Sequence, residues 1–173
     1  DWSSDVCSSD LQGASLVNSS RLTARLLPVT PVRQVGEDCG LLACIESIAR
    51  DRNIRVDQTA LSWRYPHYRR KPASDRGRVG VRAALEIMAD LGLSSNSETV
   101  HGRALAMLAA RISHGVLLVV EDDFGRTRWW RIAEIRPEGV RVMQPEAADP
   151  GRLVALTWDE VEAVRGCALA FDP

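Results

Sequence analysis

The residue best suited to take part in a chemical reaction is Cys39, a cysteine placed where a helix is expected to begin. Asp38 can cap the N-terminus of a helix that starts at Cys39. Unpaired backbone N–H groups and the positive end of the helix dipole favour a thiolate at this position. Gly40 leaves the approach to the sulfur open, and Gln34 could donate a side-chain N–H to an oxyanion. Together these residues predict a nucleophilic cysteine with an oxyanion-stabilising carboxamide.

Without its neighbours, Cys39 is equally compatible with a small buried apolar side chain. The other three cysteines, Cys7, Cys44 and Cys167, show no spacing such as Cys-x-x-Cys that would predict a metal site. Cys39 and Cys44 lie five residues apart on one expected helix, about 7.5 Å of axial rise, which is too far for a disulfide. We therefore expect no disulfide framework, no metal or other cofactor, and a reducing compartment.

The composition is that of a globular domain. The chain has 173 residues, of which 45% are apolar and 26% charged, enough for one domain with its own core. The net charge of -1 lacks the cationic excess on which non-specific nucleic-acid binding depends. The longest apolar run, residues 116–120, is far shorter than the about 20 residues that span a bilayer. We therefore expect a cytoplasmic domain that has no nucleic-acid partner.

The first 31 residues lack the pattern of a folded element. Residues 1–11 have neither the apolar nor the basic segment of a signal peptide. They resemble the translation of a common sequencing adapter, so we interpret them as an assembly artefact rather than a natural Ser/Asp-rich tail. Residues 12–31 are polar, unpatterned and interrupted by Pro28 and Pro31, which predicts a leader or linker. The domain is expected to cover residues 32–173.

Helices are expected first and strands afterwards. The apolar spacing predicts helices over residues 39–53, 57–63, 81–91 and 104–112, the third ending at Gly92. Strands are expected at residues 116–120, 129–135, 140–143, 153–156 and 168–171. Thr157 is expected to cap a short helix through Val164, with Glu160 completing a capping box. This order predicts an α+β fold with N-terminal helices packed on a C-terminal antiparallel sheet.

The string Gln34-Val-Gly-Glu-Asp-Cys39-Gly-Leu-Leu-Ala resembles the nucleophile motif of the double-glycine leader peptidases. These are papain-like cysteine peptidase domains fused to bacteriocin and type I secretion ABC exporters. The resemblance continues through residues 54–61, 81–93, 116–120 and 156–171. It implies a papain-like fold and cleavage after a Gly-Gly pair, with Cys39 as the nucleophile and Gln34 at the oxyanion hole. A histidine opening the central strand would be the base, and an aspartate in an Asp-Pro pair would orient it.

The strand that should begin with this histidine departs from the family's pattern. It reads Arg128-Trp129-Trp130. A general base must accept a proton near neutral pH, whereas arginine stays protonated and an indole only donates. Losing the base of a nucleophile–base pair costs several orders of magnitude in rate. With Arg128 and Trp129 replacing the histidine, we expect no effective proteolysis.

Two further positions differ from the family. Gln144-Pro145 stands where Asp-Pro is expected, and Gln34 lies five residues before Cys39, where the family usually has six. Residues 140–147 also resemble part of the degenerate peptidase-like domains of type I secretion exporters, which are non-proteolytic docking sites for an unfolded passenger. The resemblance thus implies a recognition domain for a secretion substrate or leader peptide. Its other partners would be the membrane and ATPase domains of an exporter, which would tether it to the inner membrane.

An active peptidase is the alternative, because His114 could act as a shifted base with Asp122 or Asp123. That alignment would leave one strand of the family without a counterpart. His114 is therefore better explained as a polar residue at a loop–strand junction. His101, expected to open the helix segment at 104–112, and His67, in the basic loop at residues 64–78, are expected to be surface residues.

Two aromatic features have both a functional and a simpler interpretation. The basic, aromatic segment 63–71 could bind an acidic secretion substrate or a neighbouring part of a transporter, but a solvated charged loop explains it more simply. Trp129 and Trp130 could floor a peptide groove. Alternation along a strand, however, points one indole to each side of the sheet, and ordinary packing accounts for at least one of them.

Overall fold

The computed structural model describes residues 25–27, 29–36, 39–65, 76–93, 96–101, 115–121, 127–163 and 167–172. Its helices are α1 (Gly40–Asp51), α2 (Gln58–Arg64), α3 (Arg76–Asp90) and α5 (Trp158–Ala163). Its strands are β1 (Arg25–Leu26), β2 (Asn96–His101), β3 (Gly115–Glu121), β4 (Thr127–Arg136), β5 (Gly139–Met143), β6 (Val154–Thr157) and β7 (Cys167–Asp172). The expected helices and strands within these ranges are confirmed, apart from differences at their ends.

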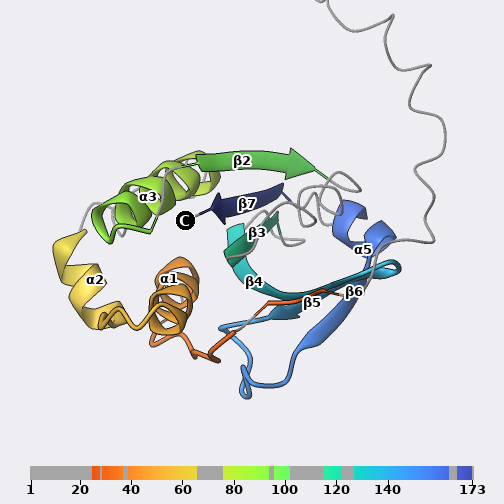
Figure 1. Cartoon of the computed structure of the whole chain (residues 1–173), viewed down its shortest axis with the longest axis horizontal. Helices are drawn as coiled ribbons and strands as arrows, with labels where there is room; N and C mark the ends of the chain where they lie inside the picture. The colour runs from red at the N-terminus through yellow and green to blue at the C-terminus, as the bar shows by residue number, and fades with distance from the viewer. Residues whose placement is uncertain are drawn as a thin grey trace, which may run out of the picture.

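The strands described form one antiparallel sheet in the order β2-β7-β3-β4-β5-β6, to which β1 is added along β4. Figure 1 shows α1, α2 and α3 on one side of this curved sheet and α5 near β6. In β4 a bulge between Ile132 and Glu134 shifts the register toward β5, whereas the pairing of β4 with β3 is regular from Thr127 to Ile132. Helices packed on an antiparallel sheet make this an α+β fold.

Alternation along β3 and β4 separates two hydrophobic cores. Leu117, Val119 and Trp129 belong to the core shared with α1, α2 and α3. Leu118 belongs to the core on the other side, which includes α5, and Trp130 packs against that second core. The two indoles therefore lie on opposite faces of the sheet, as strand alternation predicts.

Local signals in the sequence set several helix ends. Asp57 accepts a hydrogen bond from the Ala60 N–H (2.8 Å) and caps α2. Gly92 follows α3 with a φ of 68°, a left-handed conformation that glycine adopts without steric cost. The capping box of α5 is also confirmed. The Thr157 N–H donates to Glu160 Oε2 (2.7 Å), and the Glu160 N–H donates to Thr157 Oγ1 (3.2 Å).

Helices α1 and α3 differ at their ends from the sequence-based expectation. Helix α1 begins at Gly40, so that Cys39 is its N-cap rather than its first residue, and Asp38 lies outside the described residues. The helix ends at Asp51, before the expected Asn53, because Asn53 adopts a positive φ of 58°. Helix α3 already begins at Arg76, where the polar residues of its first turn gave no apolar stripe to detect.

Two strands were not predicted. The expectation that His101 opens a helix is wrong, because it is the last residue of β2, which pairs with β7. Strand β2 is at the edge of the described sheet and is polar, so it carries little of the apolar alternation that identifies a strand. Strand β1 lies in the stretch predicted as a leader or linker, and the Leu27 N–H that follows it donates to the Ala133 carbonyl (2.8 Å).

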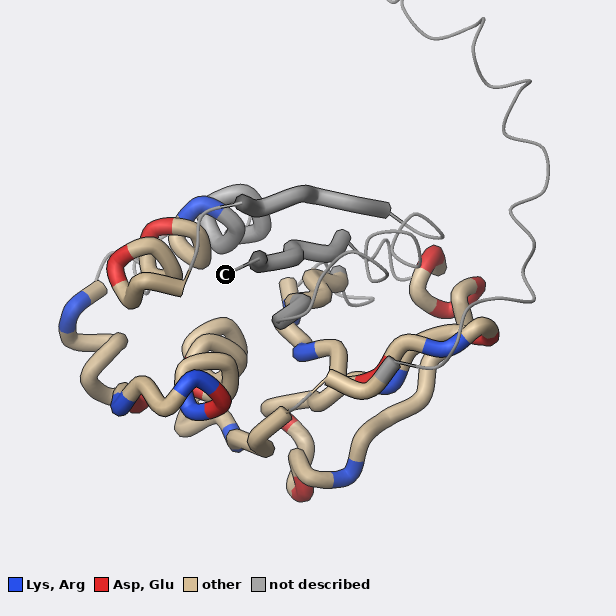
Figure 2. The backbone as a smooth tube through the Cα atoms, viewed as in Figure 1, with Lys and Arg blue, Asp and Glu red and all other residues tan. Residues whose placement is uncertain are grey.

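The helix expected at 104–112 and most of the basic segment 63–71 lie outside the described residues. Acidic and basic residues are interspersed along the described backbone (Figure 2). None of the helices in the described part of the chain is long and apolar enough to span a bilayer.

Candidate functional site

The N-terminal end of α1 presents Cys39 as a buried thiol with a fractional exposure of 4%. Its N–H donates to the Gly36 carbonyl (3.0 Å), and its own carbonyl accepts from the Ala43 N–H (2.9 Å), the first bond of the helix. A Cβ atom at position 36 would stand 3.6 Å from the Cys39 sulfur. Glycine at this position therefore leaves the space beside the sulfur unfilled.

Gln34 reaches the same end of α1. Its Oε1 lies 3.4 Å from the point where a Cβ atom of residue 40 would stand. Its backbone N–H donates to the Pro145 carbonyl (2.9 Å), which joins it to the segment after β5. The structure thus brings Gln34 and Cys39 together, and the role of Gln34 as an oxyanion donor remains a prediction.

Strand β4 presents Trp129 to this end of the helix. The Trp129 carbonyl oxygen and Cβ lie 3.8 and 3.9 Å from the same point beside Gly40, and the indole is buried. Arg128 lies on the other face, where its Nη1 is 3.7 Å from Glu146 Oε1. Trp130, also on that face, donates from Nε1 to the same carboxylate (2.7 Å). Of the two residues predicted to replace the catalytic histidine, Trp129 is therefore the one beside Gly40, the residue that follows Cys39.

Gln144, predicted to replace the catalytic aspartate, follows β5 and is half-buried. Its carbonyl accepts from the Ala147 N–H (3.1 Å) in a turn, and the next residue, Pro145, contacts the backbone of Gln34. The loop that carries Gln144 is thereby joined to the segment that carries Gln34. A role for the Gln144 side chain remains a prediction.

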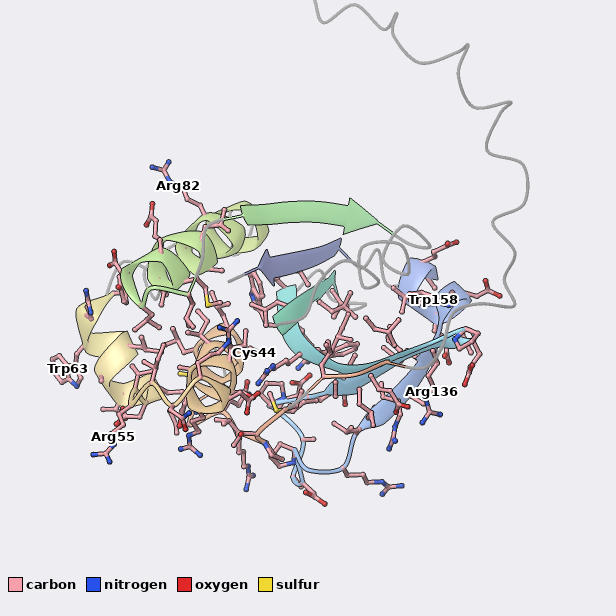
Figure 3. All side chains as sticks on the ribbon, in the orientation of Figure 1. Cys44, Arg55, Trp63, Arg82, Arg136 and Trp158 are labelled. Carbon is pink, nitrogen blue, oxygen red and sulfur yellow. The ribbon has the colours of Figure 1, made fainter. Side chains whose placement is uncertain are left out.

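Cys44, one turn further along α1, holds the helix against β4. Its sulfur donates to the Trp129 carbonyl (3.4 Å), and the side chain is fully buried between helix and sheet (Figure 3). Burial raises the pKa of the Cys44 thiol far above its ordinary value, which keeps the sulfur protonated. Cys44 is therefore a packing residue and not a second nucleophile.

A buried ion pair that the sequence analysis did not predict joins the C-terminal end of α1 to β4. Arg131 Nη2 lies 2.5 Å from Asp51 Oδ2, and Arg131 Nη1 donates to Ser47 Oγ (2.6 Å). Burial lowers the pKa of the Arg131 guanidinium, and the Asp51 charge opposes that shift. Asp51 Oδ1 also accepts from the Thr30 N–H (3.0 Å). The sequence signal that could have revealed this pair is the position of Arg131, two residues after Trp129 and therefore on the same face of the strand.

The register of the sheet limits which histidine could serve Cys39. His101 is in the same cross-strand row as Trp129, but three strands away through Cys167 and Val119, about 14 Å at the usual strand spacing. His114 and His67 lie outside the described residues. Gly115, the residue after His114, begins β3 four positions from Val119, about 13 Å along the strand. The described side chains include no group of three or more His, Cys, Asp or Glu able to hold a metal ion.

No protein-family model matches the chain, and neither does any of the curated proteins. Among solved structures, it is similar to the peptidase domain of Streptococcus ComA, a bi-functional ABC transporter involved in a quorum sensing pathway. The TM-score is 0.58 at 10% identity, covering 83% of this chain and 98% of that one. It is also similar to a double glycine motif protease from an AMS/PCAT transporter, solved with its leader peptide, with a TM-score of 0.52 at 13% identity and coverage of 86% and 94%. The fold is therefore that of papain-like cysteine peptidases, as the sequence resemblance implied.

Proposed function

We propose that this chain is a peptidase-like substrate-recognition domain of a bacterial ABC exporter of the type I secretion or bacteriocin kind. It binds a polypeptide at the Cys39 end of α1 and does not cut it. The observation that carries the proposal is the identity of the β4 side chain beside that end. Trp129 stands beside Gly40, in the stretch of β4 where the sequence resemblance predicts the histidine of a cysteine peptidase.

An indole cannot supply the missing step. Attack by a cysteine requires transfer of the thiol proton to a group within hydrogen-bond reach that is basic near neutral pH. The Trp129 nitrogen is only a donor, and the Trp129 carbonyl accepts the hydrogen bond of the Cys44 sulfur. The sheet register also keeps the backbone of His101 about 14 Å from the backbone of Trp129.

The remaining groups suit recognition of an extended peptide. Gly36 leaves room beside the Cys39 sulfur, and Gly40 leaves room beside Gln34 and Trp129, which suits a ligand segment without side chains such as a Gly-Gly pair. The Gln34 carboxamide offers both a donor and an acceptor to a peptide backbone. One structural neighbour, the double glycine motif protease, was solved in complex with a leader peptide. The exporter context, with membrane and ATPase domains as partners and a cytoplasmic site at the inner membrane, rests on the sequence resemblance and the shared fold.

The second candidate is an active leader peptidase with Cys39 as its nucleophile. One observation favours it: Cys39 is retained at the N-cap of a 12-residue helix, with the Gln34 carboxamide beside Gly40. In this candidate Cys39 would supply the nucleophile and Gln34 the oxyanion donor. This candidate needs a base other than the residues described on β4.

The experiment compares the wild type with Cys39→Ala on a fluorescent leader peptide that contains Gly-Gly. Anisotropy measures binding, and mass spectrometry measures cleavage. We expect binding with affinities within about threefold for the two proteins, and no product from either. A peptide of the same composition in scrambled order is the control. Product formed by the wild type but not by Cys39→Ala would establish the second candidate, and equal affinity for the scrambled peptide would overturn recognition.

A further inference from the structure

Gln58, the first residue of α2, is a buried carboxamide that holds the chain on both sides of Gln34. Its Oε1 accepts from the Val35 N–H (3.0 Å), and its Nε2 donates to the Arg33 carbonyl (2.8 Å). The side chain has a fractional exposure of only 3%. A single residue of α2 therefore binds the backbone groups that flank the predicted oxyanion residue.

The backbone of residues 33–35 is held from two directions. The Gln34 N–H donates to the Pro145 carbonyl (2.9 Å), so three consecutive residues are hydrogen-bonded, two to α2 and one to the segment after β5. Val35 is 68% exposed, so burial does little to hold it. These hydrogen bonds fix the backbone from which the Gln34 side chain extends toward Gly40.

Glu46 of α1 in turn fixes the orientation of Gln58. The buried Glu46 Oε2 accepts from the Gln58 N–H (3.2 Å) and from its Nε2 (3.0 Å). The other oxygen, Glu46 Oε1, pairs with Arg50 at 2.5 Å. Exchanging the amide oxygen and nitrogen of Gln58 would place its oxygen against Glu46 Oε2 and the Arg33 carbonyl. Only a carboxamide supplies the required donors and acceptor together.

We propose that Gln58, oriented by Glu46, is a positioning residue for the candidate site. It holds residues 33–35 so that the Gln34 carboxamide stands beside the N-terminal end of α1. The polypeptide that this site would bind is the one named in the proposed function, on which this part of the inference rests. Glu46 of α1 and Gln58 of α2 would thus act on the site through the backbone of residues 33–35 and not by touching the ligand.

The first test measures the segment itself and requires no peptide. Gln58→Met keeps the length of the side chain but removes its hydrogen bonds. Leu61→Ala is the matched control, because Leu61 is a fully buried residue of the same helix. Hydrogen exchange by NMR should be faster at the Val35 N–H in Gln58→Met by on the order of tenfold, compared at equal global stability. The side-chain amide signals of Gln34 should shift only in Gln58→Met. Equal exchange and equal signals in both variants would overturn the proposal.

The second test asks whether Gln58 acts through Gln34. Gln34→Ala and Gln58→Met should each weaken binding of the Gly-Gly leader peptide, and the double variant should bind no more weakly than Gln34→Ala. If the losses of peptide affinity in the two single variants add up in the double variant, the positioning role is overturned. If the wild type binds no peptide, the proposed function fails, and the exchange of the Val35 N–H decides the positioning inference alone.

Discussion

The two ends of α1 meet β4 through different chemistry. At the N-terminal end Cys39, Gln34 and Trp129 bring together a thiol, a carboxamide and an indole, none with a fixed charge. Near the C-terminal end Arg131 forms a buried ion pair with Asp51. Both β4 residues face the helix, two positions apart on one strand. The ionised group that β4 presents to α1 therefore serves the packing of helix on sheet, whereas the β4 side chain at the N-terminal end, Trp129, is not a base.

The largest effect is expected at the charged end. Arg131→Met leaves the buried Asp51 carboxylate without its counter-charge and should lower the free energy of unfolding by about 3–5 kcal/mol. Urea denaturation followed by circular dichroism measures the change. The double variant Arg131→Met/Asp51→Leu should lose less than the single one, because no uncompensated charge remains. A loss below 1 kcal/mol in Arg131→Met would mean that this end does not anchor the helix.

The neutral end is tested by placing an imidazole there. Trp129→His should lower stability by about 2 kcal/mol through lost packing. The imidazole should raise cleavage of a Gly-Gly leader peptide by about 100-fold or more over the wild type. Mass spectrometry of the products measures cleavage, with Cys39→Ala/Trp129→His as the inactive control. Unchanged cleavage in a folded Trp129→His protein would show that position 129 is not the site of the missing base.

The two cysteines of α1 sharpen the contrast within one helix. Cys44 is fully buried with a strongly raised pKa, whereas Cys39 is at the helix terminus. Iodoacetamide at neutral pH should therefore modify Cys44 at least about tenfold more slowly than Cys39. Tandem mass spectrometry over a time course assigns the label to each sulfur. Comparable rates would indicate that α1 opens as a whole before either thiol reacts.

The smallest effect is expected on the opposite face of β4. Arg128 is 39% exposed and lies 3.7 Å from Glu146, so its ion pair is screened by solvent. Arg128→Met should change the free energy of unfolding by no more than about 0.5 kcal/mol. Urea denaturation under the conditions used for Arg131→Met gives the direct comparison. A loss as large as that of Arg131→Met would remove the distinction between the two faces of the strand.

Sequence could predict the features that depend on near neighbours in the chain. The pair Thr157 and Glu160 at the start of α5 was predicted as a capping box because the two residues lie only three positions apart. Cys39 was placed at the correct helix end, one position from its observed role as N-cap.

Features set by strand register and long-range contacts could not be predicted in this way. Whether Arg128 or Trp129 faces α1 depends on how β4 pairs with β3, and one residue of slip reverses the answer. The hydrogen bonds of Gln58 reach residues 23 and 25 positions away. The polar strand β2 gains its stability from pairing with β7, which local pattern does not reveal.

The bulge in β4 has a consequence for how the domain can diverge. An extra residue at a bulge is absorbed locally, because two residues then oppose one on the neighbouring strand. The bulge lies between Ile132 and Glu134, after the stretch that pairs regularly with β3. The hairpin formed by β4 and β5 can therefore gain or lose a residue during evolution while Trp129 keeps its place opposite α1.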